Sequence, residues 1–458
     1  MPRHAGPRPR ILRAAFAAGA LLLAVQPPSS SPPLLLPPPL LRALSASPPG
    51  ALPRERALTP ARAVDPATLP ALLVRVQTVW DVPPHEILNE LWPLRVAAER
   101  ALGRRLEAAE GGAEADLYII GPYGGQRAEA EALAARTRGR AVTLFLGSEN
   151  ADGSGGRYEE TRDHLVGATT ISIGFRRDLE PRHGHGGPPP QGGEGGEGGG
   201  EGGGGAEQPG GEPHPDPMHI ARPYLRMPAW LCGICQRDNA TGVALPPHLR
   251  RADGPRASAA EAERAAAAWA AREGFAALLS SHYAPPRGEM FDALSGLGRV
   301  DGTGAAFHTM DWPAELPNNY LHGKVPFLRR YRFSVCPENS RSSDGGYTSE
   351  KMPQALVAGA VPVYWGDAPA AEVWSEGRVL RWSEGDGGAA ALEIVRQLES
   401  NLTFQREWFA RPELVAGADA WVASWLARLE SLLREAFGKM QRARAQHEID
   451  KKAVGLAR

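Results

Sequence analysis

The segment Tyr331-Arg-Phe-Ser-Val-Cys-Pro-Glu-Asn-Ser340 begins the stretch of sequence that decides the fold, and Ala358-Gly-Ala-Val-Pro-Val-Tyr-Trp-Gly366 completes it. Each segment contains a short apolar run with the length and composition of a buried strand. Between them, the residues from about Glu350 to Ala358 are predicted to form a helix. A strand, a helix and a second strand in this order are typical of a βαβ unit with parallel strands.

Polar side chains gather where the first strand ends and the helix begins. The strand delivers Glu338 and Asn339 to the sheet edge, and Thr348 or Ser349 is expected to cap the helix. A helix N-terminus favours anions, and Lys351 in the first turn adds a full positive charge. The pattern indicates a diphosphate site, although an ordinary capped helix with a surface lysine fits the spacing equally well.

The alternation of strands and helices extends over most of the chain. Strands are predicted at 72–76, 116–120, 141–146 and 169–173, and helices at 87–106, 126–136 and 258–279. Strands that alternate with helices favour parallel sheets covered by helices. We therefore predict an α/β fold of two doubly wound, Rossmann-like domains that face a cleft, where ligands meet the carboxyl ends of the strands.

Composition divides the chain into regions. The 53 glycines and 43 prolines are concentrated in residues 1–70 and 181–217. Neither region can bury a core, so we predict a Pro-rich stem and an expanded Gly-rich loop that is disordered. The loop interrupts an N-terminal domain at 71–275. A C-terminal domain with a closing helix follows at 276–440, and a solvated basic tail at 441–458.

The N-terminus resembles a targeting segment. Four arginines precede the apolar run from Ala14 to Val25, as in a signal peptide or a short signal anchor. An organellar transit peptide is the alternative, because the first 48 residues contain no Asp or Glu. The sequons Asn239-Ala-Thr241 and Asn401-Leu-Thr403 fit a luminal chain.

Charge and cysteine content exclude several classes of function. The 51 Lys and Arg residues against 52 Asp and Glu residues give a net charge of −1, which argues against a nucleic-acid partner. Cys232-Gly-Ile-Cys235 could close a small disulfide loop, but a zinc site would need a second ligand pair. Cys336 is read as a small buried hydrophobe. With no Asp-x-Asp motif that stands out, we predict no obligatory metal.

The motifs, taken together, resemble one family. The series Glu338-Asn-Ser340, Tyr347-Thr-Ser-Glu-Lys351 and Ala358–Gly366 is similar to the donor-binding motif of the α1,3/4-fucosyltransferases, glycosyltransferase family 10. Further resemblances follow in the expected order at Leu144-Phe-Leu-Gly-Ser-Glu-Asn150, Tyr224-Leu-Arg-Met-Pro228, Tyr283-Ala-Pro-Pro-Arg287 and Phe291-Asp-Ala-Leu294. The last two segments together resemble the family's N-A-P-x-R-x-x-F-Y-D-A-L stretch. The resemblance implies a GT-B architecture, GDP-fucose as the donor, and inversion at the sugar carbon.

The resemblance also implies a role for each of six residues. Glu149 is the expected general base, although a loop or cap carboxylate is the plainer interpretation of that position. The other five are expected to bind the donor: Arg287 and Lys351 at the GDP diphosphate, Asn339 and Tyr347 along the nucleotide-sugar pocket, and Glu350 at the ribose. A displacement needs both a carboxylate for the acceptor proton and cations at the leaving diphosphate.

The expected protein is a luminal fucosyltransferase that transfers L-fucose to a GlcNAc-containing glycan in α1,3 linkage, in protein glycosylation. Its expected place is the Golgi membrane, as a single-pass type II protein held by the N-terminal anchor. A divalent cation is expected at most to stimulate it. Pro337 stands where the family has Phe, so a GT-B transferase with another donor is one alternative; an inactive glycan-binding relative is the other.

Overall fold

The structure, a computed structural model, describes most of the chain from Thr68 onward. The described residues are 68–77, 84–109, 114–121, 132–133, 135–146, 169–174, 224–228, 230–281, 283, 286–317, 323–341, 347–367 and 372–456. The predicted anchor, nearly all of the predicted stem and the predicted insertion at 181–217 lie outside them. Within the described ranges, no helix has the length and apolar character needed to cross a membrane.

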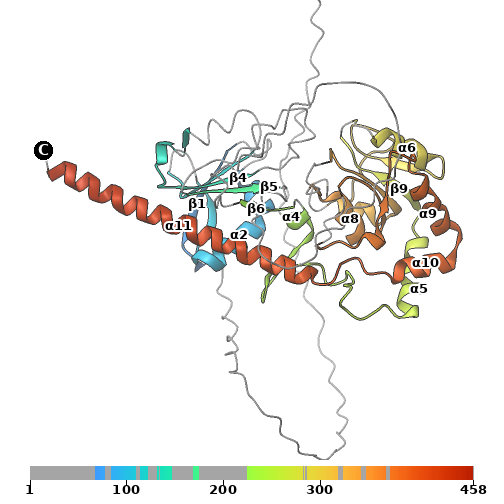
Figure 1. Cartoon of the computed structure of the whole chain (residues 1–458). Coiled ribbons are helices and arrows are strands. Elements are labelled where there is room, and N and C mark those ends of the chain that lie inside the picture. The colour runs from blue at the N-terminus through green and yellow to red at the C-terminus, as the bar shows by residue number, and fades with distance from the viewer. Residues whose placement is uncertain are drawn as a thin grey trace, which may run out of the picture. The chain divides into compact units, whose positions relative to one another are not determined.

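The first sheet has six parallel strands in the order β2-β1-β3-β4-β5-β6 (Figure 1). Their bounds are β1 Ala71–Gln77, β2 Arg105–Ala108, β3 Leu117–Ile120, β4 Val142–Leu146, β5 Thr170–Gly174 and β6 Tyr224–Arg226. Every residue of β3 and β4 is buried, as expected for a parallel sheet covered on both faces. All four strands predicted in this half are confirmed.

The helix predicted at 87–106 is wrong in its extent. The chain instead forms α1 (Pro84–Glu90), α2 (Trp92–Leu102) and then strand β2. Gly103 ends α2 with φ +61, a left-handed conformation that glycine adopts without steric cost. The Gly signal was present in the sequence, but the apolar residues on both sides of it concealed the change from helix to strand.

A second sheet holds five parallel strands in the order β10-β9-β11-β12-β13. The bounds are β9 Gly274–Leu278, β10 Val300–Gly302, β11 Tyr331–Pro337, β12 Val361–Trp365 and β13 Leu380–Arg381. In the central pair, Phe333 lies opposite Val361 and Pro337 opposite Trp365. The βαβ unit predicted from the opening motif is thereby confirmed.

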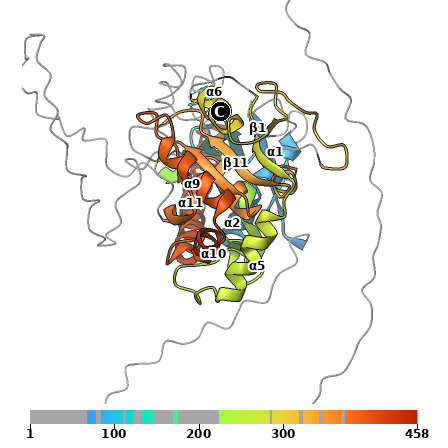
Figure 2. The same ribbon diagram turned by 90° about the vertical axis from the view of Figure 1, so that its right-hand side faces the viewer.

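Helices flank this second sheet. They are α5 Ala259–Ala270, α6 Arg287–Ser295, α7 Lys324–Leu328, α8 Lys351–Val357, α9 Ala389–Ser400 and α10 Leu402–Ala410. The helix predicted at 258–279 is therefore too long, because its end is strand β9. Helix α5 packs on α10, beside the second sheet, and so lies on the other side of the boundary that we placed at 275 (Figures 1 and 2).

The two parallel sheets with their helices confirm the predicted α/β class of two Rossmann-like units, the GT-B arrangement. Short elements complete the described fold: α4 (Trp230–Ile234), the hairpin of β7 (Gln236–Asp238) and β8 (Gly242–Ala244), and the 3-10 turn η5 (Glu376–Arg378). That the units face each other across a cleft stays a prediction.

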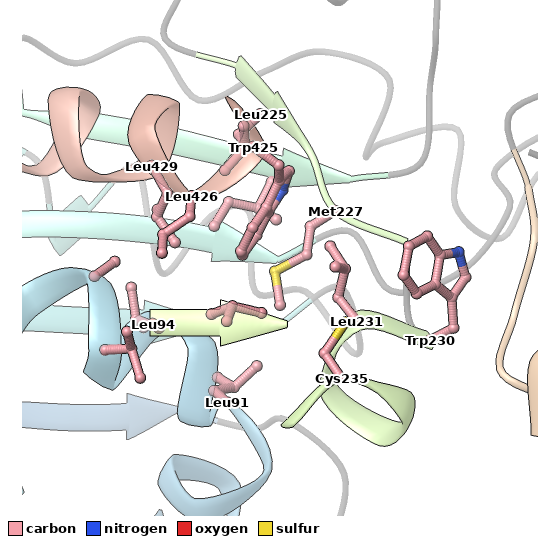
Figure 3. Packing of buried hydrophobic residues seen from close by; sticks show 14 of the residues in the cluster. Leu91, Leu94, Leu225, Met227, Trp230, Leu231, Cys235, Trp425, Leu426 and Leu429 are labelled. Atoms are coloured by element: carbon pink, nitrogen blue, oxygen red, sulfur yellow. The ribbon is translucent and has the colours of Figure 1, made fainter. Parts of the chain in front are cut away.

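The largest core joins α4 to the C-terminal helix α11 (Ala418–Leu456) and to residues of both halves. Trp230 is fully buried, with its ring centroid 5.3 Å from that of Trp374 and 5.8 Å from that of Trp421. Trp425 donates from its indole nitrogen to the carbonyl of Arg226 at 3.0 Å. Figure 3 shows this packing around Leu231 and Cys235. Burial of several large side chains here, at about 25 cal/mol per Å² of apolar surface, ties α11 to the first sheet.

The end of the chain is more ordered than predicted. Helix α11 continues to Leu456, so the solvated tail expected at 441–458 is helical over nearly all of its length. Arg444 in this region donates to the Asp116 carboxylate at 2.7 Å and to the carbonyl of Arg140 at 2.7 Å. The charges that suggested a frayed end thus include one that holds the helix to the first sheet.

The cysteines are all free thiols. Cys235 and Cys336 are buried and Cys232 is partly exposed, so the small disulfide loop is not formed. Burial raises the pKa of Cys232 and that of Cys336, each to about 12. The structural role predicted for Cys336 is confirmed by its 1% exposure.

Candidate active site

Five of the six predicted site residues lie at one edge of the second sheet. Strands β9, β11 and β12 are parallel, so their carboxyl ends share that edge. Helix α6 begins at Arg287 after β9, and α8 begins at Lys351 between β11 and β12. Loops at the carboxyl ends of parallel strands are where α/β proteins bind ligands.

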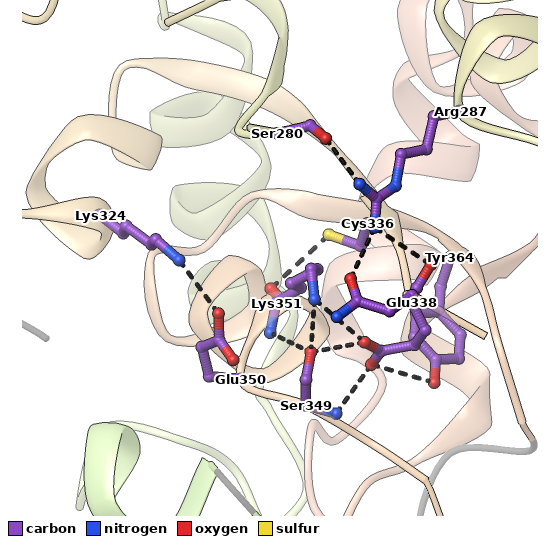
Figure 4. A network of polar contacts seen from close by, with 10 residues as sticks. Ser280, Arg287, Lys324, Cys336, Glu338, Ser349, Glu350, Lys351 and Tyr364 are labelled. Atoms are coloured by element: carbon purple, nitrogen blue, oxygen red, sulfur yellow. Dashed lines mark hydrogen bonds and ion pairs between the residues drawn. The ribbon is translucent and has the colours of Figure 1, made fainter. Parts of the chain in front are cut away.

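A buried carboxylate organises this edge. Glu338 follows β11 directly and has no exposed surface. Its carboxylate accepts hydrogen bonds from the Ser349 backbone N–H at 2.8 Å, the Ser349 hydroxyl at 2.5 Å and the Tyr364 hydroxyl at 3.4 Å. A buried ion is tolerated only when it is paired and hydrogen-bonded, and these partners meet that requirement (Figure 4).

Lys351 supplies the matching charge. Its ammonium group lies 3.2 Å from Glu338 Oε2 and donates to the Ser349 hydroxyl at 3.0 Å. Burial would lower the pKa of Lys351, but the carboxylates of Glu338 and Glu350 outweigh that effect and raise the pKa above its ordinary value. The side chain keeps 22% of its surface exposed, so this protonated ammonium remains accessible to a ligand.

Arg287 reaches the same segment from α6. Its guanidinium donates to the Ser280 hydroxyl at 2.9 Å, to Asn339 Oδ1 at 2.6 Å and to the Glu338 carbonyl at 3.5 Å. The positive charge of Arg287 also acts to lower the pKa of Lys351. The structure therefore brings Arg287, Asn339 and Lys351 together around Glu338.

Glu350 and Tyr347 each contact a charged side chain of the protein. The Glu350 carboxylate, only 3% exposed, accepts from Lys324 of α7 at 3.0 Å. Tyr347 is buried, and its backbone N–H donates to the Asp367 carboxylate at 2.8 Å. Figure 4 shows the Lys324–Glu350 pair apart from the Glu338 contacts. A ribose contact by Glu350 stays a prediction. A ribose hydroxyl would have to share the Glu350 carboxylate with Lys324.

The cap predicted for α8 is wrong. Glu350 occupies the N-cap position, and it makes no capping hydrogen bond through its side chain. The Ser349 hydroxyl does accept from the Lys351 N–H at 3.4 Å, but its shorter bond is to Glu338. The hydroxyl donates its hydrogen to the buried carboxylate at 2.5 Å, and a hydrogen bond to an ionised acceptor is among the stronger kinds.

The remaining predicted residue, Glu149, lies outside the described residues. It follows β4, which ends at Leu146, and β4 is a central strand of the first sheet. Its role as the general base stays a prediction.

Several residues of the site were not predicted. Ser280 follows β9, Lys324 begins α7, and Tyr364 and Asp367 lie at the end of β12, so only the fold brings these three segments to one edge. Glu338 was noticed as a strand-end carboxylate, but its burial was not. The position of a carboxylate directly after an apolar strand and before a polar turn does not reveal whether it faces solvent or the interior.

The charges at the edge favour an anion. Among the side chains named at the site, Arg287, Lys324, Lys351 and Arg381 are cationic, while Glu338, Glu350 and Asp367 are anionic. Arg381 donates to the carbonyls of Gly366 at 2.9 Å and Asp367 at 2.6 Å. One positive charge is left over among these groups. A local excess of this kind, within a chain of net charge −1, suits a ligand such as a diphosphate.

Comparison with known proteins points in the same direction. No protein-family model matches the chain. Over 102 residues it is 31% identical to the α-(1,3)-fucosyltransferase FucT of Helicobacter pylori, a match that covers 22% of this chain and 20% of that protein. The predicted resemblance to the α1,3-fucosyltransferases is confirmed. The chain matches only about a fifth of the length of this curated relative.

Solved structures with a similar backbone include two crystal structures of an α1,3-fucosyltransferase. The first has a TM-score of 0.46 at 16% identity and covers 81% of this chain and 92% of its own. The second, with GDP-fucose, has a TM-score of 0.45 at 16% identity and covers 84% and 94%.

Proposed function

We propose that this chain is an inverting fucosyltransferase that transfers L-fucose from GDP-fucose to a hydroxyl of a GlcNAc-containing glycan, in α1,3 linkage. The observation that carries the proposal is the convergence of Arg287 and Lys351 on Glu338 at the carboxyl edge of a parallel sheet. The sequence resemblance and the match to FucT support the choice of donor.

The proposed reaction is a direct displacement at the anomeric carbon of fucose. The acceptor oxygen forms a bond to that carbon while the bond from the carbon to the diphosphate oxygen breaks, and GDP leaves with the electron pair. Arg287 and Lys351 would stabilise the negative charge that develops on the leaving diphosphate. Glu149 would take the proton of the acceptor hydroxyl.

Glu338 contributes indirectly in this scheme. It holds the Lys351 ammonium in one place and keeps the pKa of that group high, so the lysine meets the donor as a cation. Ser349 and Tyr364 also donate hydrogen bonds to the Glu338 carboxylate, so Lys351 is not the sole group that stabilises this buried charge. Lys351 can therefore turn part of its hydrogen-bonding capacity toward a phosphate, since an ammonium group has three donors.

The proposal includes a membrane location. A basic start followed by the apolar run from Ala14 to Val25 supports insertion as a type II Golgi protein with a luminal catalytic domain. Its test is the fate of a C-terminally tagged chain expressed in animal cells. Resistance to alkaline extraction together with glycosylation at Asn239 or Asn401 is expected, and import into mitochondria or plastids would contradict it.

The activity is tested by a transfer assay with the full chain on a glycan array, with linkage analysis of the products. GDP-fucose, GDP-mannose and UDP-sugars are offered in parallel, with and without a divalent cation. Transfer from GDP-fucose alone is expected. Transfer from another nucleotide sugar would favour the alternative suggested by Pro337, and glycan binding without transfer from any donor would favour an inactive relative.

A further inference from the structure

Tyr283 is an exposed aromatic residue four residues before Arg287 of the proposed diphosphate site. Among the described residues, the exposed large hydrophobic side chains are Tyr283, Leu402, Ile449 and Val454, and Tyr283 is the one aromatic of this group, at 75% exposure. A single exposed apolar side chain needs no explanation. Tyr283, however, is the outer member of a stack of rings.

The stack has three members that lead from solvent to the core. The Tyr283 ring centroid lies 4.5 Å from that of Phe307, at an interplanar angle of 54°. Phe307 in turn stacks on Phe291, at 5.2 Å and 30°. Phe291 and Phe307 both pack on the core of the second sheet. The exposed ring is therefore supported from behind, which reduces the entropy lost when a ligand binds it.

Phe307 is held in a strained conformation. Its φ of +58 lies in the left-handed region, which costs a bulky residue about 1–3 kcal/mol. The loop around it is tied down by hydrogen bonds between Gly302 and Thr309, in both directions at 2.8 Å. A Cβ at Gly302 would collide with the carbonyl of Phe307, and one at Gly304 with the carbonyl of Ser280. Strain that the surroundings enforce is characteristic of functional positions.

The stack and the proposed diphosphate site share their framework. The Ser280 carbonyl accepts from the N–H of Ala306 in the Phe307 loop, and the Ser280 hydroxyl accepts from Arg287. Phe291 lies four residues after Arg287 on α6, so both lie on one face of that helix. Helix α6 and strand β9 carry this framework (Figure 1). Ser280 and α6 thus connect the ring stack to Arg287.

We propose that Tyr283, backed by Phe307 and Phe291, is a stacking platform for the purine base of the nucleotide donor. The inference rests on the proposed function and extends it to base recognition. The base is favoured over an acceptor sugar because Phe291 and Phe307 pack on the core of the second sheet, whose helices α6 and α8 begin at Arg287 and Lys351. The family motif has Asn at this position, whose amide offers no such ring, so the platform is a feature of this chain.

The test measures GDP and inorganic pyrophosphate binding to the full chain by titration calorimetry. Stacking of one base on an aromatic side chain contributes about 1–3 kcal/mol, so Tyr283→Ala should raise the Kd of GDP about 5- to 150-fold. Pyrophosphate lacks a base, and its Kd should not change. Tyr283→Trp should bind GDP at least as tightly as the parent. Leu402→Ala, which removes another exposed apolar side chain, is the matched control and should bind GDP normally.

Two outcomes would overturn the platform. One is an unchanged Kd of GDP in Tyr283→Ala; a raised KM for the glycan in that variant would then assign the ring to the acceptor. The other is an equal loss of pyrophosphate binding, which would indicate a distorted Arg287 site. If the parent transfers fucose but Tyr283→Ala binds GDP as tightly as the parent does, the platform is wrong and the proposed function stands. If Tyr283→Ala binds GDP more weakly but the parent transfers no fucose, the platform stands and the proposed function is wrong. If the parent does not bind GDP, both are wrong.

Discussion

The ammonium group of Lys351 lies 3.2 Å from Oε2 of Glu338, a carboxylate with no exposed surface, at the edge of the second sheet. The lysine is a residue that the sequence assigns to the donor, and the glutamate is one that it does not. The pair explains how a cation can be kept charged and in a fixed position at the end of a buried strand. It also makes the proposed binding site and the stability of the fold depend on the same contact.

Loss of the lysine should weaken nucleotide binding. Lys351→Ala removes a charged hydrogen bond, and we expect a loss of about 1.5–3 kcal/mol in GDP affinity by calorimetry. Lys324→Ala, which removes the partner of Glu350 and not of Glu338, is the comparison. If Lys351→Ala and Lys324→Ala lose GDP affinity equally, the total positive charge at this edge determines the affinity for GDP, and the position of Lys351 does not.

The pair should show energetic coupling in folding. Glu338→Gln and Lys351→Met each break the contact, and urea unfolding should give a coupling energy of about 0.5–3 kcal/mol in a double-mutant cycle. Glu338→Gln should be the more destabilising single change because it also weakens the bonds from Ser349 and Tyr364. Strict additivity of the two changes would mean that the ion pair contributes nothing to the fold.

The contribution of Lys351 to stability should be lost at high pH. Its pKa is raised in the folded protein, so the native state holds the proton more tightly than the unfolded chain does. The contribution is therefore complete below the unfolded lysine value of about 10.4 and declines as the pH rises through the folded value. We expect the difference in unfolding free energy between the parent and Lys351→Met to be constant from pH 7 to 9 and to shrink above that range. A difference that grows with pH would contradict the raised pKa.

The general base is tested by an isosteric change. Glu149→Gln should abolish fucose transfer while GDP affinity stays near that of the parent, because the carboxylate is expected to act on the acceptor proton and not on the donor. Reduced GDP affinity in this variant would show that the base has been assigned to the wrong residue.

A second buried ion pair should matter for stability alone. Arg378, only 3% exposed, lies 2.8 Å from Glu413, which also binds Arg250 at 3.2 Å. Burial lowers the pKa of Arg378 to about 10, yet the group remains charged at neutral pH. Glu413→Gln leaves this charge without its counterion, and we expect a loss of about 3–5 kcal/mol in unfolding free energy.

The control for that change is Glu393→Gln. Glu393 pairs with Arg396 on the exposed side of α9 at 3.3 Å, and this loss should cost less than about 1 kcal/mol. If Glu413→Gln and Glu393→Gln lower the unfolding free energy by similar amounts, the burial of Arg378 is not the reason for the loss. Since neither residue lies at the proposed site, GDP affinity should be unchanged in both.

Local patterns in the sequence were sufficient for strands β1, β3, β4, β5, β11 and β12 and for the resemblance to the fucosyltransferases, whereas β9 was predicted to be the end of a helix. Runs such as those of β11 and β12 are recognisable because a strand buried on both faces is mostly apolar. The sequence was less informative at element ends, where Gly103 converts an apparent single helix into a helix and a strand.

Tertiary structure alone decided which polar and charged side chains meet. Lys324 and Glu350 are 26 residues apart, Arg287 and Asn339 are 52 apart, and neither pairing leaves a trace in local sequence. The reason is physical: periodicity reports which face of an element is buried, whereas an ion pair depends on how separate elements are packed. The sequence therefore pointed to Arg287 and Lys351 as cations of the proposed anion-binding edge, and the fold determined that the buried Glu338 holds Lys351 there.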